Sequence, residues 1–287
     1  MRRRPGAGGG GGGIEDGRTE VVELTVDGRA RRYRVVPPDD YDASRPWPVI
    51  IGYHGGGEDN TGQKMEVNWI AQRGKSAFLV FPDGEGGGWC VPGMDPNDPI
   101  GDPQKDARFT QAMIQDLGKR WKIDQDKVYA VGFSNGGMEV WNLVCNHAEW
   151  FAGFGIMSAS MTDGEVASCK PSVTRPIVYL HGTADHSFGG RVSEGDHHLV
   201  LVSSAETVSA ITKAYGCKKE PKTETREDRC GNGRVPTIHR FEGCKGDAPI
   251  EYVKIENGSH SWAGGRGGCE NVDASEEMLG VFGLSGR

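Results

Sequence analysis

The string Gly132-Phe133-Ser134-Asn135-Gly136 constrains the fold of this chain more than any other feature. It matches G-x-S-x-G, a sharp turn in which a serine stands between a buried strand and a helix. Residues 128–131 before it are apolar, as in a buried strand, and the residues after it show helical periodicity. Such a turn exposes the serine Oγ atom and places backbone N–H groups of the helix start beside it. We therefore predict that Ser134 is a nucleophile and that the N–H of Asn135 helps to hold an oxyanion.

A second glycine-rich turn follows an apolar segment upstream. Residues 47–53 have the pattern of a buried strand and lead into His54-Gly55-Gly56-Gly57. The string is similar to the HGGG loop, in which a backbone N–H completes an oxyanion hole. Glycine suits that task because the backbone itself must approach the substrate closely. We predict that Gly56 supplies the second donor; the alternative is a glycine-rich turn that merely ends a strand.

A candidate acid lies downstream of the serine. Residues 176–180 have the pattern of a buried strand and end in His181-Gly182-Thr183-Ala184-Asp185. A carboxylate at the end of a core strand can orient a histidine and stabilise its imidazolium form. Asp163 and Asp247 do not follow a strand in this way. We therefore predict that Asp185 is the acid, with an aspartate that caps a turn as the alternative.

The base is sought among eight histidines. His260 alone follows a late strand and also lies after both Ser134 and Asp185 in the chain. His54 and His181 precede glycines, and we expect them to brace loops. The remaining histidines lie in helical or polar stretches and are interpreted as surface residues. The order serine, acid, histidine is that of the α/β-hydrolases and differs from the orders in chymotrypsin and subtilisin.

Four strings together resemble the α/β-hydrolases of the polyhydroxybutyrate depolymerase and feruloyl esterase type, a family of mostly secreted bacterial esterases. The strings are His54-Gly55-Gly56, Gly132-Phe133-Ser134-Asn135-Gly136-Gly137, His181-Gly182-Thr183-Ala184-Asp185 and Gly258-Ser259-His260-Ser261-Trp262. The resemblance implies a serine esterase that forms an acyl-enzyme on short or aromatic acyl esters, such as feruloyl or acetyl esters of plant polysaccharide. Polyhydroxybutyrate depolymerase activity and acyl transfer to an acceptor other than water are the alternatives.

The order of expected elements predicts an α/β fold. Strands are expected at 49–53, 77–82, 128–131, 153–157, 176–180 and 250–255, after a hairpin over 21–37 around Asp27-Gly28. Helices are expected at 65–73, 108–121, after Ser134, at 205–215 and at 275–282. Such alternation implies a mostly parallel central sheet with helices on both faces and the site at the carboxyl ends of the strands.

Composition limits the domain organisation and the partners. Residues 1–17 are glycine-rich and are interpreted as a disordered tail or linker, and residues 18–287 as a single catalytic domain. The net charge of -7 argues against a nucleic-acid partner, and no apolar run is long enough to span a membrane. We expect a monomer whose partner is a small ester or a polymer-linked ester.

Seven cysteines favour an oxidising compartment, and we expect a secreted or extracellular protein. No C-x-x-C pair occurs, so we predict no metal site, and we expect no cofactor. Spacing favours the bridges Cys145–Cys169 and Cys217–Cys244, of which the second resembles a pairing common in the family. An odd number leaves at least one thiol free or paired between chains. Alternatively, several of these cysteines are buried apolar side chains.

Two tryptophans are candidates for contact with the substrate. Trp89 lies in the polar segment 85–105, which is rich in Gly, Pro and Asp, and long irregular segments of this kind are often functional. Its ring could stack on an aromatic acyl group or a sugar; the alternative is that it anchors the loop. Trp262 lies two residues from His260, so we expect it to border the pocket and either pack against the base or touch the substrate.

Overall fold

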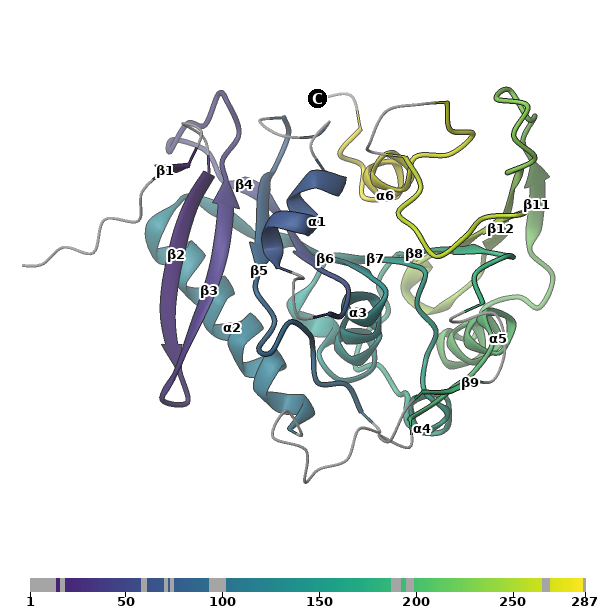
Figure 1. Cartoon of the computed structure of the whole chain (residues 1–287), viewed down its shortest axis with the longest axis horizontal. Coiled ribbons are helices and arrows are strands. Elements are labelled where there is room, and N and C mark those ends of the chain that lie inside the picture. Colours follow the sequence, from purple (N-terminus) through teal and green to yellow (C-terminus); the bar gives the residue numbers. More distant parts are fainter. Residues whose placement is uncertain are drawn as a thin grey trace, which may run out of the picture.

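The computed structural model describes residues 14–15, 19–57, 61–69, 72, 75–92, 102–186, 192–194, 199–264 and 269–285. Within these ranges, an 11-stranded sheet runs through the molecule in the order β1-β2-β3-β5-β4-β6-β7-β8-β13-β12-β11 (Figure 1). Its strands are β1 (Ile14–Glu15), β2 (Thr19–Val26), β3 (Arg29–Val36), β4 (Trp47–Tyr53), β5 (Phe78–Pro82), β6 (Ile123–Phe133), β7 (Gly153–Met157), β8 (Ile177–Gly182), β11 (Lys222–Thr225), β12 (Pro236–Phe241) and β13 (Ile250–Ile255). A separate two-stranded pair consists of β9 (Val192–Glu194) and β10 (Leu199–Leu201).

The centre of the sheet is parallel and its two edges are antiparallel. Strands β5, β4, β6, β7, β8 and β13 pair in parallel, whereas β2 and β3 flank one side and β12 and β11 the other in antiparallel pairing. Every residue of β4, β5, β7 and β8 is buried, because helices cover both faces of parallel strands. The α/β-hydrolase architecture predicted from the alternation of elements is confirmed.

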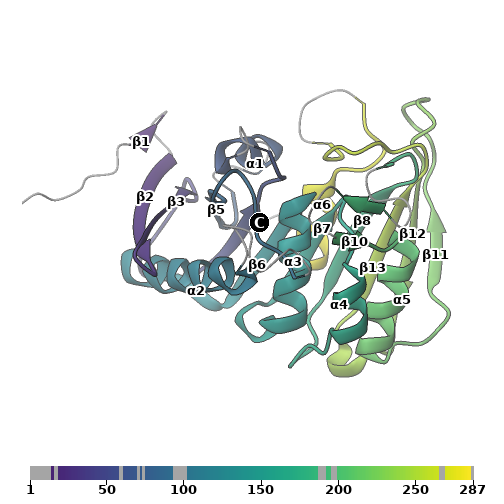
Figure 2. The same ribbon diagram turned by 60° about the horizontal axis from the view of Figure 1, so that its bottom comes forward.

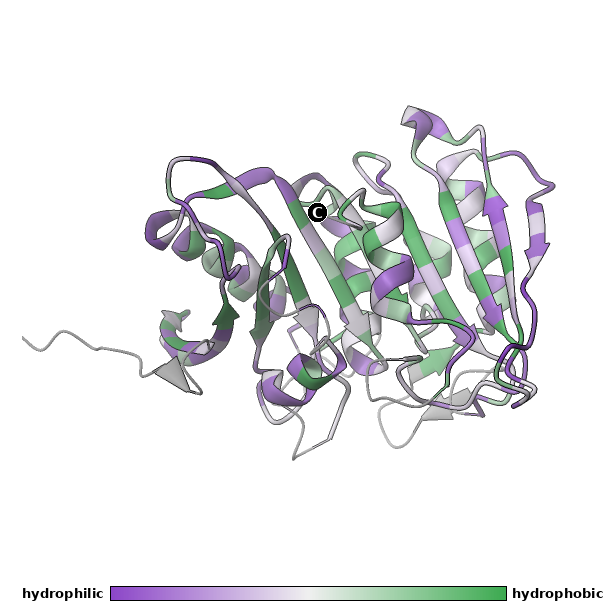
Figure 3. Cartoon of the chain, turned by 90° about the horizontal axis from the view of Figure 1, so that it is seen from above, coloured by the Kyte–Doolittle hydropathy of each residue, from purple (hydrophilic) through white to green (hydrophobic). Residues whose placement is uncertain are grey.

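Helices lie on both faces of the sheet (Figures 1 and 2). One face carries α2 (Pro103–Arg120), α3 (Asn135–Asn146), α4 (Asp163–Ser168) and α5 (Ser204–Tyr215), and the other carries α1 (Gly62–Asn68) and α6 (Ala274–Val281). Adjacent residues of β4 show how the sheet divides the core: Ile51 joins the cluster under α3, and Ile50 joins the cluster under α1 and α6. Apolar residues are concentrated in the central strands, while polar residues increase toward the edge at β11 (Figure 3).

Two expected helices and the strand expected at 128–131, which is β6 (Ile123–Phe133), differ by several residues in their limits from the structure. Helix α2 begins at Pro103, five residues before the expected start at Arg108, because Asp102 caps it through a hydrogen bond from Gln104 N to Oδ1 (2.9 Å). Helix α1 covers Gly62–Asn68 rather than 65–73. The hairpin expected around Asp27-Gly28 is present as β2 and β3, and both turn residues have positive φ angles.

Three disulfides cross-link the chain. Cys145–Cys169 and Cys217–Cys244 are the two bridges predicted from the sequence, and Cys230–Cys269 is a third that the sequence did not assign. Cys90 is the remaining, buried thiol. Three bridges in one chain are typical of an oxidising compartment. None of the described helices is long and apolar enough to cross a membrane. Of the expected tail, only Ile14–Glu15 lies among the described residues, as β1 paired with β2.

Candidate active site

Ser134 stands at the sharp turn between β6 and α3. Its backbone has φ 53° and ψ −126°, a combination that L-residues rarely adopt. The turn is held by a hydrogen bond from Ser134 N to Met157 O (3.0 Å) and by one from Met138 N to Ser134 O (3.0 Å). A Cβ atom on Gly132 would lie 2.2 Å from the Gly136 carbonyl oxygen, so only glycine permits this close approach. Ser134 therefore stands at a tight turn between the end of β6 and the start of α3.

The structure brings together Ser134, His260 and Asp185. His260 Nε2 lies 2.9 Å from Ser134 Oγ, and His260 Nδ1 lies 2.9 Å from Asp185 Oδ2. Asp185 follows β8 and His260 follows β13, and these two strands are neighbours in the sheet. Because the carboxyl ends of parallel strands meet at one edge, residues that are remote in sequence converge there.

The surroundings of Asp185 suit an ionised acid that accepts a hydrogen bond from the histidine. The Asp185 side chain is fully buried, whereas 31% of the His260 side chain is exposed. Burial raises the pKa of Asp185, but interactions with His260, His181 and Ser158 outweigh burial and leave that pKa below its usual value. An ionised Asp185 can only accept, so His260 Nδ1 carries the hydrogen and Nε2 is left to accept from Ser134.

Backbone contacts join the loop of the acid to the loop of the histidine. Ala184 N donates to Gly258 O (2.9 Å), and Asn257 N donates to Thr183 Oγ1 (2.8 Å). A Cβ atom on Gly182 would lie 2.1 Å from the Gly258 oxygen, so the two loops are in close contact. These contacts fix the backbones of the two loops relative to each other.

The two predicted oxyanion donors lie beside the serine. A Cβ atom built on Gly56 would lie 3.2 Å from Asn135 Cβ, and one on Gly55 would lie 3.4 Å from Ser134 Cβ. The loop after β4 therefore runs along the start of α3. Gly56 is exposed, while Ser134 and Asn135 are half-buried, so a substrate can reach this place.

His54 braces the loop that contains Gly56, as its position before glycine suggested. Its Nε2 accepts from Gly84 N (2.8 Å), and its Nδ1 therefore donates to Gly55 O (2.7 Å). Burial lowers the pKa of His54, although the Gly55 carbonyl and nearby acids oppose that change. The neutral ring thus cross-links two loops and is not placed to act as a base.

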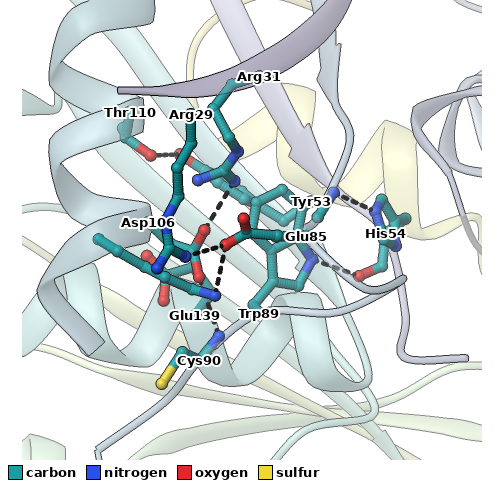
Figure 4. A network of polar contacts seen from close by, with 12 residues as sticks. Arg29, Arg31, Tyr53, His54, Glu85, Trp89, Cys90, Asp106, Thr110 and Glu139 are labelled. Carbon is teal, nitrogen blue, oxygen red and sulfur yellow. Dashed lines mark hydrogen bonds and ion pairs between the residues drawn. The ribbon is translucent and has the colours of Figure 1, made fainter. Parts of the chain in front are cut away.

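The Trp89 ring is buried in this structure and presents no open face for stacking. The side chain is 1% exposed, and its Nε1 donates to His54 O (2.8 Å) (Figure 4). Its backbone is held by the Asn135 side chain, which accepts from Trp89 N (2.7 Å) and donates to Trp89 O (3.1 Å). Trp89 therefore anchors its loop against the start of α3, which was the alternative considered from the sequence.

Trp262 is also buried and offers no open face to a substrate. It is 8% exposed and lies between Trp69 and Phe133, with ring centroids 6.0 and 6.4 Å away. Phe133 in turn lies 5.1 Å from the His260 ring. Two roles were expected for Trp262, and these contacts support packing: Trp262 packs against Phe133, which in turn packs against the His260 ring. Phe133 was missed by the sequence prediction, although its place next to Ser134 could have identified it.

A buried ion pair supports the chain after Trp89. Asp106 Oδ1 accepts from Arg31 Nη2 (2.7 Å), and Asp106 Oδ2 accepts from Cys90 N (2.9 Å) (Figure 4). Both members of the ion pair are buried. Burial, with the charge of Asp106, raises the pKa of Cys90 to about 12, so its thiol stays protonated and is not a competing nucleophile. In the described part of the chain, no cluster of three His, Cys, Asp or Glu residues could hold a metal ion.

Comparisons with known proteins identify esterases as relatives of this chain. No family model matches the chain. It is 31% identical over 239 residues to a protein from Aspergillus oryzae described as "Probable feruloyl esterase C", covering 79% of this chain and 76% of that protein. It is 27% identical over 265 residues to "Putative esterase NocK" from Nocardia uniformis subsp. tsuyamanensis, covering 88% and 76%. The acetyl xylan esterase structure from Aspergillus awamori shares the fold, with a TM-score of 0.60 at 13% identity over 93% of this chain and 100% of that one.

Proposed function

Because this chain belongs to the feruloyl esterase family of α/β-hydrolases and is a serine esterase, we propose that Ser134, His260 and Asp185 hydrolyse short or aromatic acyl esters through an acyl-enzyme. Feruloyl or acetyl esters of plant polysaccharide are the proposed substrates. The observation that carries the proposal is the unbroken series of two 2.9 Å contacts from Ser134 Oγ through the imidazole to Asp185.

The first half of the reaction forms the acyl-enzyme. His260 Nε2 takes the hydroxyl proton while Ser134 Oγ attacks the ester carbonyl carbon, and Asp185 stabilises the imidazolium that results. The tetrahedral intermediate then collapses. The bond to the alkoxy oxygen breaks, and His260 gives its proton to the departing alcohol.

The second half releases the acid. Water loses a proton to His260 Nε2 and attacks the acyl carbon, and the bond to Ser134 Oγ breaks as the serine regains its proton. In both halves the carbonyl oxygen becomes negative, and the backbone N–H groups of Gly56 and Asn135 are proposed to bind it. The packing of the Gly56 loop against the start of α3 supports this assignment. A single donor of this kind contributes roughly 10²- to 10³-fold to kcat.

Two observations support the preference for short or aromatic acyl groups: the names of the related esterases and the scarcity of exposed large apolar side chains in the described part of the chain. Among the described residues, Val67 is the one large apolar side chain that is exposed. A site for long alkyl chains gains about 0.8 kcal/mol for each buried methylene and needs apolar surface to match. We propose export from the cell on the basis of the three disulfides, and a monomer that binds neither nucleic acid nor membrane.

The catalytic roles are tested with Ser134→Ala and, as a matched control, Ser209→Ala on the exposed side of α5. Hydrolysis of p-nitrophenyl acetate should fall by about 10⁶ in kcat for Ser134→Ala, because only oxyanion binding and substrate binding remain. Ser209→Ala should match the wild type, and circular dichroism should be the same for all three. Retention by Ser134→Ala of more than about a hundredth of wild-type kcat would exclude the assignment.

The substrate class is tested with a panel of esters. We expect kcat/KM to be highest for methyl ferulate or p-nitrophenyl acetate and to fall along the series to p-nitrophenyl palmitate. An optimum at dodecanoate or longer would contradict the proposal. Faster release of acid from polyhydroxybutyrate than from feruloylated or acetylated xylan would favour the depolymerase alternative. An added alcohol that captured most of the acyl group would favour acyl transfer.

A further inference from the structure

A second imidazole faces the buried carboxylate of Asp185. His181 Nε2 lies 3.7 Å from Asp185 Oδ2, the same oxygen that lies 2.9 Å from His260 Nδ1. His181 is the penultimate residue of β8 and is 2% exposed. Its Nε2 has no hydrogen-bond partner, although it is fully buried. A buried polar atom without a partner is costly, so its direction toward Asp185 calls for a physical explanation.

Tyr179 and the charge of Asp185 together favour one tautomer of His181. The Tyr179 hydroxyl lies 2.8 Å from His181 Nδ1. Burial raises the pKa of Tyr179 well above its ordinary value, so the phenol keeps its proton. It can donate that proton to Nδ1, while Ser160 Oγ, 3.4 Å away, can donate to the phenol oxygen. His181 Nε2 then carries the hydrogen and directs it at Asp185. The opposite tautomer would place a lone pair against the negative oxygen, which is electrostatically unfavourable.

His181 stays neutral beside the acid. Burial lowers the pKa of His181 to about 4; Asp185 opposes this effect and His260 adds to it. Of the neighbouring side chains, Ser158 also helps to lower the pKa of Asp185, whereas Lys254 and Tyr252 are engaged elsewhere. Lys254 pairs with His181 in the register of β13 and β8, but its Nζ is 3.7 Å from Glu256 Oε2 and its side chain is 46% exposed. Tyr252 OH, also from β13, donates to Ser204 Oγ (3.2 Å).

We propose that His181 is a positioning residue for the proposed triad: its Nε2–H, oriented by Tyr179, holds the Asp185 carboxylate in the ionised and aligned state that His260 requires. The separation of 3.7 Å exceeds an ordinary hydrogen bond, so the contact acts as an N–H dipole directed at a buried charge. The low dielectric of the surroundings strengthens such an interaction. This inference rests on the proposed function, since it assigns a task to the neighbour of its acid.

The first test uses two substitutions that retain different halves of the imidazole. The amide nitrogen of glutamine can occupy the place of Nε2, whereas that of asparagine reaches only the place of Nδ1. We expect His181→Asn to lower kcat for p-nitrophenyl acetate about tenfold with KM within about twofold, the loss expected for an interaction with a charged group. His181→Gln should stay within about threefold of wild-type kcat. Equal losses in the two variants would overturn the proposal.

The second test asks whether His181 acts through Asp185. In an Asp185→Asn background, His181→Asn should lower the residual kcat by less than about twofold, since coupled residues are non-additive. A purely structural role would give the same tenfold factor in both backgrounds, and that result would overturn the proposal. The two variants are compared by thermal unfolding, so that a loss of folded protein is not counted as a loss of kcat.

Tyr179→Phe keeps the test decisive if His181→Asn fails to fold. This change removes the hydroxyl that orients His181 and leaves both imidazoles and Asp185 in place. We expect a loss of about three- to tenfold in kcat, again absent in the Asp185→Asn background. An unchanged kcat in Tyr179→Phe would count against the orienting contact. Because Ser134→Ala tests the nucleophile separately, failure of these variants would leave the proposed function standing, whereas an active Ser134→Ala would remove both.

Discussion

Oδ2 of Asp185 lies 2.9 Å from Nδ1 of His260, although 75 positions separate them in the chain. The contact is made between the ends of the adjacent strands β8 and β13, and it is shielded because the Asp185 side chain is fully buried. A carboxylate in that position fixes the tautomer that leaves Nε2 able to accept a proton from Ser134.

Replacing the acid should abolish most activity without unfolding the protein. Asp185→Asn keeps the shape of the side chain but favours the wrong imidazole tautomer, and we expect kcat to fall by about 10⁴. Asp163→Asn, in the exposed first turn of α4, is the matched control and should retain full activity. Steady-state kinetics on p-nitrophenyl acetate decide between them. If Asp163→Asn were inactive and Asp185→Asn active, the wrong carboxylate would have been assigned.

Trp89→Phe should lower turnover for every substrate alike. The change removes the hydrogen bond from Nε1 to the His54 carbonyl oxygen, which helps to fix the loop that contains Gly56. Loss of one whole oxyanion donor costs about 10²- to 10³-fold, so loosening the loop should cost about tenfold in kcat. Because the ring is buried, the loss should be equal for methyl ferulate and p-nitrophenyl acetate.

Trp150→Phe is the control for this experiment. Trp150 stacks on His147 with ring centroids 4.1 Å apart, at the opposite end of α3 from Ser134, and its replacement should leave kcat unchanged. A Trp89→Phe variant that lost activity only on methyl ferulate would show that the ring contacts the acyl group after all.

Glu165 should make the protein less stable as the pH rises. Its Oε2 accepts from Thr162 N (2.8 Å), and burial raises its pKa to about 7 against the opposing hydrogen bonds from Thr162. Between its unfolded value of 4.5 and about 7, the folded protein holds a proton that the unfolded chain has lost. The stabilisation is therefore complete below the unfolded pKa and is lost as the pH rises through the folded one.

Glu165→Gln tests this linkage, because glutamine can keep the capping contact without titrating. We expect the free energy of unfolding in urea to fall less between pH 5 and pH 8 than in the wild type, by on the order of one kcal/mol or more. Glu206→Gln is the control, since Glu206 makes the same capping box with Ser203 on α5 but is only half-buried. If the free energy of unfolding fell between pH 5 and pH 8 by as much in Glu165→Gln as in the wild type, the pH dependence would not come from Glu165.

The protein as isolated from an oxidising compartment should contain one free thiol. Three bridges use six of the seven cysteines and leave Cys90. Thiol titration should therefore give one equivalent in denaturant and almost none in the folded state, where Cys90 is buried. A Cys217→Ser/Cys244→Ser variant should lose about 2–4 kcal/mol of stability. Seven titratable thiols in denatured, unreduced protein would refute the bridges.

The sequence by itself identified the elbow at Ser134 and the order of the three candidate catalytic residues. These signals are local: an apolar strand, glycines where a Cβ atom would collide, and a helical repeat. The parallel sheet followed because strands that alternate with helices must pair in parallel, and their carboxyl ends then meet. Two of the disulfides were also predicted from the sequence, the bridge Cys217–Cys244 with support from the family resemblance.

Tertiary structure alone decided what surrounds that site. Trp89 could equally have been a binding surface or an anchor, because a sequence does not state which backbone will cover a ring or accept its N–H. The bridge Cys230–Cys269 forms because β11 and β12 pair back onto the sheet beside β13. The edge strand β11 consists of exposed polar and charged residues, so there was no hydrophobic pattern from which to predict it. The approach of His181 to Asp185 likewise arises only when a loop folds back on its own strand, since burial and distance are properties of the packed molecule.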